Sequence, residues 1–245
     1  MKIGAIIQAR MSSTRLPGKI MKDLSGQPLL WHVIDRVRTC RMIDEIVLAS
    51  TANEKDEVLE RFAKENDIKL FRGSEEDVLE RYLHAAKKYN IDMIVRITSD
   101  CPLIDPKTVD KLIEKHIEYR ADYSSNILER TYPRGLDTEV FSTVLLEEID
   151  KIATEKFQRE HVTPYFYQKP SKYSLNNLVA EKKLNRPDYR LCVDTIEDLE
   201  LIKLIYGKLY NPPDIVSIEN VIDLLDKEPG LAQININIKQ KELID

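Results

Sequence analysis

The sequence predicts an α/β protein with a mostly parallel central sheet that is covered by helices on both faces. Three observations support this fold class. Short apolar runs at 3–7, 45–50 and 93–98 alternate with segments of helical periodicity. These runs lack the alternation of a half-exposed strand, which is typical of parallel strands that are buried on both faces. The helical segments between them are long enough for right-handed crossovers, which keep successive strands parallel.

The first half of the chain holds the regular part of this pattern. Pro28 can open a helix, because a first helical residue needs no N–H donor. The apolar residues of that helix recur at helical spacing, at Leu30, Val33, Ile34 and Val37. The other expected segments here are strands at 69–71 and 93–98 and helices over 58–63, 78–86 and from Pro106 through 113.

After Tyr123 the rhythm changes. Short strand candidates at 123–126, 139–141 and 173–178 are mixed with loops and a helix over 145–152. We expect mixed or antiparallel pairing here, and a smaller lobe over 123–178, for substrate binding or dimerisation, within a single domain spanning 1–245. A core strand at 189–193 and helices over 196–209 and 218–225 follow. The tail after Gly230 alternates weakly and predicts either an edge strand or an ordered arm.

Composition excludes several classes of protein. The 245 residues suffice for a substantial core, and a net charge of -5 with a pI near 5.6 argues against general nucleic-acid binding. No apolar run approaches the roughly 20 residues that span a bilayer, and the N-terminus lacks a secretory pattern. We therefore expect a cytoplasmic protein without a membrane partner. Cys40, Cys101 and Cys192 are odd in number and widely spaced, which predicts reduced thiols.

The loop over 8–19 carries the strongest functional signal. It follows the first apolar strand directly and combines Arg10, Arg15 and Lys19 with several hydroxyl side chains and a glycine. Backbone N–H groups and hydroxyls can surround phosphate oxygens, while arginine offers a planar fork and lysine a point charge. This composition predicts a site for a nucleoside triphosphate or a similar polyanion. The alternative is a charged surface loop.

Two aspartates stand where predicted strands end. Asp100 follows the strand at 93–98, and Asp194 ends the strand at 189–193, so both belong to the edge where open α/β sheets bind ligands. Carboxylates there can hold Mg²⁺ against triphosphate oxygens. The alternative role is helix capping. Asp105 is better placed than Asp100 to cap the helix at Pro106, whereas for Asp194, with Glu197 at capping-box spacing, ligand and cap stay equally open.

Two further stretches and one histidine are weaker candidates. Gly73 and Ser74 follow a short strand and can approach a base or ribose, although a capped helix start explains 72–81 equally well. The turn at 132–139 gathers Arg134, an aspartate and a glutamate around a glycine, so it can bind the hydroxyls or carboxylate of a sugar; a solvated turn is the alternative. His161 is a lone histidine, and such residues are more often structural than catalytic.

These motifs together resemble a known family. The segments 8–19 and 24–29 resemble the signature of the sugar-acid cytidylyltransferases, which activate 3-deoxy-manno-octulosonate and sialic acids with CTP. The segments 99–104 and 193–199 resemble the two magnesium-binding carboxylate motifs of that family. The segments 73–81 and 133–137 are similar to its spore coat polysaccharide biosynthesis branch. The resemblance covers nearly the whole chain to about Leu225.

The resemblance implies a Rossmann-like, GT-A-type nucleotidyltransferase fold and a homodimer. It also implies that Arg10 and Lys19 hold the triphosphate and that Asp100 and Asp194 bind Mg²⁺. Two positions depart from the octulosonate enzymes. Val78 stands where those enzymes carry an arginine in the stretch that contacts the base, and 99–102 has Ser-Asp-Cys-Pro in place of Gly-Asp-Glu-Pro.

The resulting hypothesis is a Mg²⁺-dependent cytidylyltransferase that transfers CMP from CTP to an acidic sugar or related acceptor, with release of pyrophosphate, in surface polysaccharide biosynthesis. One alternative is a GT-A-type glycosyltransferase using a nucleotide sugar, which the missing Asp-x-Asp motif disfavours. The other is a non-catalytic nucleotide-binding subunit, which the intact Lys19, Asp100 and Asp194 disfavour. The expected catalytic residues are Arg10, Lys19, Asp100 and Asp194; the nucleotide-binding residues are Ala9, Arg10, Ser12, Thr14, Arg15, Lys19, Gly73, Ser74 and Asp77; the acceptor-binding residues are Arg134, Asp137, Glu139 and His161.

Overall fold

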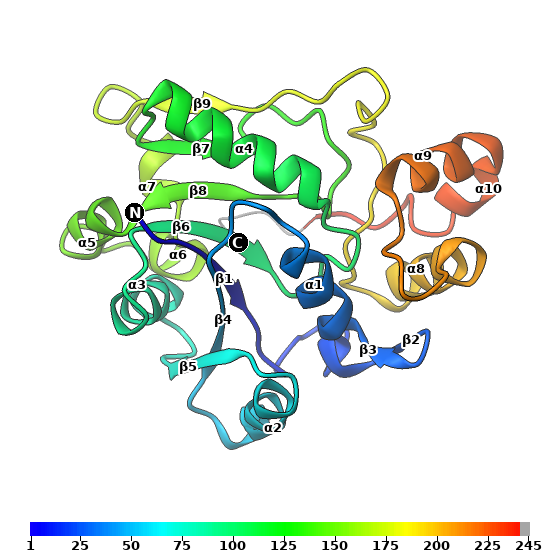
Figure 1. Ribbon diagram of the computed structural model, residues 1–245, viewed down its shortest axis with the longest axis horizontal. Helices are drawn as coiled ribbons and strands as arrows, with labels where there is room; N and C mark the ends of the chain where they lie inside the picture. The colour runs from blue at the N-terminus through cyan, green and yellow to red at the C-terminus, as the bar shows by residue number, and fades with distance from the viewer. Residues whose placement is uncertain (241–245) are drawn as a thin grey trace.

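The computed structural model describes residues 1–240, so the last five residues of the expected domain, 241–245, lie outside the described part. Within residues 1–240 a seven-stranded sheet forms the centre of the molecule, in the order β5-β4-β1-β6-β8-β7-β9 (Figure 1). A separate two-stranded hairpin pairs β2 with β3. The strands are β1 Ile3–Gln8, β2 Asp23–Leu24, β3 Gln27–Pro28, β4 Glu45–Thr51, β5 Lys69–Gly73, β6 Met93–Thr98, β7 Tyr123–Ser125, β8 Glu139–Ser142 and β9 Leu175–Asn177.

The sheet is parallel in its first half and mixed in its second. Strand β1 pairs in parallel with β4 and β6, so that Ile6 lies opposite Val47 on one side and Arg96 on the other. Strand β8 runs antiparallel to both β6 and β7, and β9 is parallel to β7. The expected parallel sheet with antiparallel pairs after Tyr123 is therefore confirmed. The strands of 123–178 extend this same sheet, and a substrate or dimerisation role for that segment stays a prediction.

Helices cover both faces of the sheet (Figure 1). One buried cluster packs α1, α2, α4, α8 and α9 against one face, and a second packs α3, α5 and α7 against the other. Within residues 1–240 no helix combines the length and the apolar character needed to cross a membrane. The helices are α1 Leu29–Arg38, α2 Glu57–Glu65, α3 Val78–Lys88, α4 Pro106–Tyr119, α5 Thr143–Asp150, α6 Lys156–His161, α7 Pro164–Tyr167, α8 Ile196–Leu209, α9 Ile218–Lys227 and α10 Pro229–Ala232, with 3₁₀ turns at Lys19–Met21 and Glu54–Asp56.

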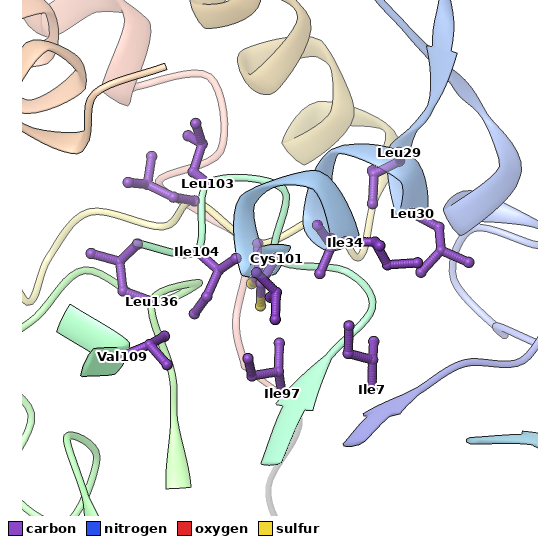
Figure 2. Close-up of a cluster of buried hydrophobic side chains, with 14 of the residues drawn as sticks. Ile7, Leu29, Leu30, Ile34, Ile97, Cys101, Leu103, Ile104, Val109 and Leu136 are labelled. Atoms are coloured by element: carbon purple, nitrogen blue, oxygen red, sulfur yellow. The ribbon is translucent and has the colours of Figure 1, made fainter. Parts of the chain in front are cut away.

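The first cluster fixes the ends of the two central strands. Ile7 of β1 and Ile97 of β6 are fully buried, and Ile34 of α1 lies over them (Figure 2). Full burial of an aliphatic side chain of this size contributes about 1.5–3 kcal/mol. Because these residues immediately precede the loops that carry Arg10 and Asp100, the core sets where both loops begin.

Two expected elements differ from the structure. Residues 189–193 form no strand; a single bridge joins Arg190 to Arg134, with Leu191 N–H donating to the Arg134 carbonyl at 2.7 Å. The run is apolar because Leu191 and Val193 are buried in the core, which does not require pairing along a ladder. The tail after Gly230 contains α10 and turns up to residue 240, so the edge strand is wrong and the arm is observed.

Candidate active site

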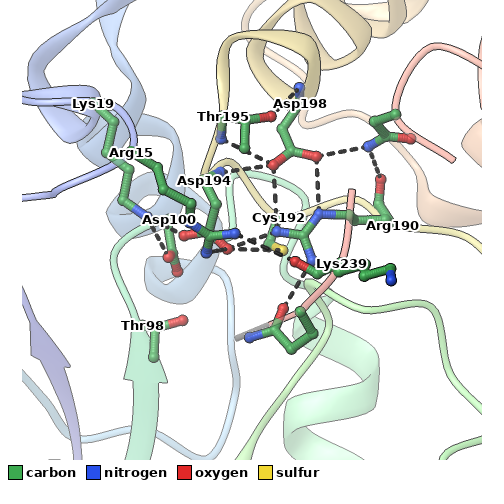
Figure 3. Close-up of polar contacts among 12 residues, drawn as sticks. Arg15, Lys19, Thr98, Asp100, Arg190, Cys192, Asp194, Thr195, Asp198 and Lys239 are labelled. Atoms are coloured by element: carbon green, nitrogen blue, oxygen red, sulfur yellow. Dashed lines mark hydrogen bonds and ion pairs between the residues drawn. The ribbon is translucent and has the colours of Figure 1, made fainter. Parts of the chain in front are cut away.

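Three segments converge at the carboxyl ends of the central strands. The loop after β1 brings Lys19, the end of β6 brings Asp100, and the segment before α8 brings Asp194. The Lys19 Nζ atom lies 2.6 Å from Asp100 Oδ2 and 2.7 Å from Asp194 Oδ1 (Figure 3). We call these three residues the carboxylate–lysine cluster. It brings together three of the four residues that the sequence predicts as catalytic.

Asp194 is held in place by two arginines. Its Oδ2 atom accepts from Arg190 at 2.6 Å and lies 2.9 Å from Nη2 of Arg15. The helix cap that the sequence left open for Asp194 belongs instead to its neighbour. Thr195 is the N-cap of α8, and Asp198 completes the capping box, so a capping role for Asp194 is wrong.

A buried carboxylate behind Asp194 organises this corner. Asp198 is fully buried and accepts from the backbone N–H groups of Asp194 and Thr195. It also accepts from Nε of Arg190 at 2.9 Å and from Nδ2 of Asn235 at 2.8 Å (Figure 3). The arm at the far end of the described chain is thereby tied to the residue that positions Asp194.

Asp100 and Lys19 of this cluster are both charged at neutral pH. Burial raises the pKa of Asp100, but the charge and hydrogen bond of Lys19, together with a hydrogen bond from Thr98, lower it to about 2. Burial lowers the pKa of Lys19, and the two carboxylates more than offset this and hold it well above its usual range. The alternative cap for α4 is confirmed at Asp105, whose side chain accepts from Thr108 N–H at 2.9 Å.

A cavity opens beside the cluster and takes in most of the loop after β1. Of the residues expected to bind the nucleotide, Ala9, Arg10, Thr14, Arg15 and Lys19 line it. The other lining residues are Gln8, Ser13, Ile20, Val78, Arg81, Thr98, Ser99, Asp100, Glu160, His161 and Asp194.

Ser12 is turned toward another loop. Its hydroxyl donates to Glu75, whose carboxylate also accepts from Asn53 and lies 3.6 Å from Arg10. The hydrogen bond from Ser12 lowers the pKa of Glu75, so this acid is ionised at neutral pH. Glu75 therefore ties the loop after β1 to the loop after β5.

Gly73, Ser74 and Asp77 are absent from the residues that line this cavity. The Asp77 carboxylate accepts from Glu80 N–H at 2.9 Å and caps α3, and it also pairs with Arg159. The Ser74 hydroxyl accepts from Asp77 N–H at 3.0 Å. The alternative of a capped helix start is confirmed for Asp77, and a nucleotide contact by these three residues stays a prediction.

A second cavity lies on the other side of the carboxylates. Arg134 lines it together with Arg15, Asp100 and Asp194. Within residues 1–240 the Arg134 guanidinium makes no hydrogen bond or ion pair, so its donors are available. The predicted partner Asp137 lines the same cavity, but both of its oxygens accept from Arg130, at 2.8 and 2.9 Å.

The two other expected acceptor residues differ in their availability. Glu139 is buried, and its carboxylate accepts from Arg96, from Tyr123 at 2.6 Å and from Thr163 at 2.6 Å. These bonds leave little capacity for a ligand. His161 lines both the first cavity and a third, which it shares with Arg134.

Comparison with known proteins decides the family. The cytidylyltransferase family profile matches residues 4–241. This chain belongs to the cytidylyltransferase family. The spore coat polysaccharide biosynthesis protein SpsF of Bacillus subtilis (strain 168) is 38% identical over 232 residues, which are 93% of this chain and 95% of that protein. The predicted resemblance to the sugar-acid cytidylyltransferases and their spore coat branch is confirmed.

Solved structures agree with this family. A cytidylyltransferase from Leptospira borgpetersenii serovar Hardjo-bovis (strain JB197) has a TM-score of 0.90 and 36% identity, over 99% of this chain and 100% of that one. The CMP:2-keto-3-deoxy-manno-octonic acid synthetase complexed with CTP has a TM-score of 0.64 at 17% identity, over 85% and 99% of the two chains. The latter shares the fold alone. The nucleotidyltransferase fold expected for this cytidylyltransferase is confirmed.

Sequence reasoning missed several residues that build the site of this cytidylyltransferase. Arg190 and Asn235 lie outside the recognised motifs, and the role of Asn235 depends on contacts with a distant segment; Asp198 lies within the segment 193–199 but was not singled out there. Arg81 could have been predicted from the sequence, because it stands three residues after Val78 and therefore lies on the same side of α3.

Proposed function

We propose that this cytidylyltransferase transfers CMP from CTP to an acidic sugar or a related acceptor, releases pyrophosphate, and serves surface polysaccharide biosynthesis. One observation carries the proposal: Asp100 and Asp194 meet at Lys19 between two cavities. Arg10 and Arg15 line the first, which suits a triphosphate. Arg134, whose guanidinium has no partner among residues 1–240, lines the second, which suits a carboxylate.

The carboxylate–lysine cluster fits a hard divalent cation such as Mg²⁺. One positive group, the Lys19 ammonium, already bridges Asp100 and Asp194, so their oxygens can share a cation. Within residues 1–240 no group of three or more metal-ligating side chains is gathered. An ion held by these two carboxylates would take its other ligands from the triphosphate and water, as Mg²⁺ commonly does. When bound, it would supply charge neutralisation at the reacting phosphate.

The chain's own residues position the reactants on this proposal. Arg10, Arg15 and Lys19 offset the charge of the departing pyrophosphate. Arg134 binds the acceptor carboxylate and aligns the acceptor hydroxyl with the α-phosphorus. The bond from that phosphorus to pyrophosphate breaks as the bond to the hydroxyl oxygen forms, and the hydroxyl proton passes to solvent. Most of the rate enhancement then comes from orientation and from prearranged charge.

The relatives support the finer parts of this proposal. SpsF bears the name of a spore coat polysaccharide protein, and the CMP:2-keto-3-deoxy-manno-octonic acid synthetase was solved with CTP. A surface polysaccharide role and CTP as donor follow by likeness. A homodimeric state and a cytoplasmic location stay predictions of the sequence.

The test is a pyrophosphate-release assay with Mg²⁺, in which CTP, UTP, ATP and GTP are each offered with a panel of acidic sugars. We expect release only with CTP and one class of acid. Asp100→Asn should lower turnover by about a hundredfold or more while the fold is retained. Asp188→Asn, at an exposed position away from the cluster, is the matched control.

Two results would contradict the proposal. Pyrophosphate release by Asp100→Asn at the rate of the control would remove the role of that carboxylate. Release of a nucleoside diphosphate from a nucleotide sugar, without pyrophosphate, would favour the glycosyltransferase alternative.

A further inference from the structure

Arg81 is a buried cation that lines the nucleotide cavity without a counter-ion. It lies on α3, one turn after Val78, and only 2% of its surface is exposed. Its Nη1 atom donates to the Ser74 carbonyl, and within residues 1–240 this is the one hydrogen bond of the guanidinium. Its Nε atom is buried without a partner. No carboxylate pairs with it in the described part of the chain.

Two other buried arginines have more partners than Arg81, and Arg96, whose Nε atom also lacks a partner, pairs with Glu139. Arg36 donates to the carbonyls of Ile104 and Val216, and Arg190 pairs with two aspartates. Burying N–H donors without acceptors is unfavourable, and burying an unpaired charge more so. Since a chain gains nothing for its own fold from such an arrangement, the unused donors of Arg81 point to a ligand in the cavity that its side chain lines.

The position of Arg81 separates it from the phosphate-binding residues. Val78 belongs to the hydrophobic cluster of the sheet face that α3 covers, and Arg81 lies on the same helix, whereas the turn that carries Lys19 lies beside α1 on the other face. Arg10 and its partner Glu75 stand next to Ser74, which Arg81 contacts. The cavity therefore runs from the carboxylate–lysine cluster, past Arg10, to the N-terminal turn of α3.

We propose that Arg81 reads the nucleobase of the bound triphosphate. Cytosine presents two adjacent acceptors, O2 and N3, to which a guanidinium can donate two parallel hydrogen bonds. Uracil has an N3–H donor in place of the N3 acceptor, so a guanidinium there faces a donor with a donor. Val78 supplies an apolar surface beside the ring. The inference rests on the proposed function for its triphosphate, and it names the residue that selects CTP.

The test measures binding alone, so that it needs no acceptor and no turnover. Titration calorimetry with Mg²⁺ gives the Kd of CTP, UTP, ATP, GTP and inorganic pyrophosphate for the full chain. The variants are Arg81→Met, which keeps much of the volume, and Arg81→Lys, which keeps the charge without the fork. The matched control is Arg72→Met on β5, whose guanidinium binds Thr51, Asn53 and Glu60 outside the cavity.

We expect the wild-type chain to bind CTP at least about tenfold more tightly than UTP. Arg81→Met should weaken the binding of CTP by about ten- to a hundredfold, which is the effect expected from the loss of one bidentate contact to a base. Its Kd for UTP and pyrophosphate should stay within about threefold of wild type. Arg81→Lys should lose the same preference, and Arg72→Met should keep it. A cooperative urea-unfolding transition shows that a variant is folded; if Arg81→Met fails this check, Arg81→Lys decides.

Two outcomes overturn the inference. Equal weakening of all four nucleotides and of pyrophosphate would make Arg81 a phosphate ligand. An unchanged preference for CTP in a folded Arg81 variant would make it structural. The proposed function fails separately: a chain that selects CTP through Arg81 but releases no pyrophosphate with any acid contradicts the reaction and leaves the base contact standing.

Discussion

The Lys19 ammonium stabilises two carboxylates that lie close to each other. Asp100 and Asp194 each lie within 2.7 Å of its ammonium, and their side chains are 22% and 15% exposed. Two carboxylates this close raise each other's pKa when no cation stands between them. With Lys19 in place, Asp100 is ionised well below neutral pH.

This pairing predicts an acid limit to stability. The pKa of Asp100 falls from 3.8 to about 2 on folding, so the unfolded chain takes up the proton first. The stabilisation is complete above about pH 4 and is lost as the pH falls through 2. In urea unfolding without metal, the free energy of unfolding of wild type should drop by about 2 kcal/mol more than that of Asp100→Asn between pH 5 and pH 2. Parallel pH profiles for the two proteins would refute the pairing.

Among single residues, the sequence predicts the roles of those that can be recognised from their immediate neighbours in the chain. Lys19 and Asp100 stand out because each follows a strand and because cations and carboxylates at that edge suggest a phosphate and a metal. Arg190 and Asn235 do not stand out. The hydrogen bond from Asn235 to the Arg190 carbonyl joins positions 45 apart, and only the folded chain brings them together.

Gly135 sets the spacing between the turn at 133–136 and the segment that carries Asp194. Gly135 has φ +105°, and a Cβ there would lie 2.6 Å from the backbone nitrogen of Cys192. The turn at 133–136 and the segment at 189–192 thus pack backbone to backbone, with Arg134 N–H donating to the Tyr189 carbonyl at 2.9 Å. A side chain at position 135 must push them apart.

The expected cost of that side chain can be separated from the cost of its dihedral angle. Gly26 has φ +87°, and a Cβ there meets nothing within 4 Å. Gly26→Ala should lower the free energy of unfolding by about 1–2 kcal/mol, for backbone strain alone. Gly135→Ala should lower it by about 3 kcal/mol or more and should also reduce turnover, because Asp194 follows the displaced segment. Equal losses in the two variants, by urea unfolding, would show that the close contact is unimportant.

Helices and strands with a clear pattern of apolar residues could be predicted from the sequence. Strands that depend on which segment lies beside them could not. The strand at 93–98 and the helix at 196–209 match the structure. The strand is a continuous apolar run buried on both faces, and the helix follows a capping signal, although the box lies at Thr195 and Asp198 and not at the predicted Asp194 and Glu197. The run at 189–193 is equally apolar, but the chain beside it turns away at Gly135 and leaves one bridge instead of a ladder. Apolar character reports burial and does not report pairing.

The first cavity is lined by residues from elements on both faces of the central sheet. Lys19 comes from beside the α1 face, and Val78 and Arg81 come from the α3 face. The loops between strands and helices can be predicted to share the same edge, since the carboxyl ends of parallel strands meet there. It could not be predicted that the strands of 123–178 join the same sheet, because no fixed rule says where an added antiparallel strand will pair.

Assembly of the cluster should coincide with the last step of folding. The two ion pairs of Lys19 join residues 81 and 175 positions apart. Closing loops of such length has a high entropic cost, and contacts of this separation form late. On dilution from urea, binding of a fluorescent CTP analogue should recover with the slowest phase of Trp31 fluorescence, followed by stopped flow. Recovery of binding in an earlier phase would contradict this order.

The wide separation in sequence between Lys19 and its two partners also has a consequence during synthesis of the chain. Lys19 is synthesised early, yet the partner that completes the bridge, Asp194, is held by Arg190, whose carbonyl accepts a hydrogen bond from Asn235 of the arm after Gly230. Asp100 is synthesised well before Asp194, so an incomplete chain can hold Lys19 by one ion pair but not by both. On the proposed function, activity requires the second carboxylate and the arm that steadies it, and so arises only after residue 235 has been made.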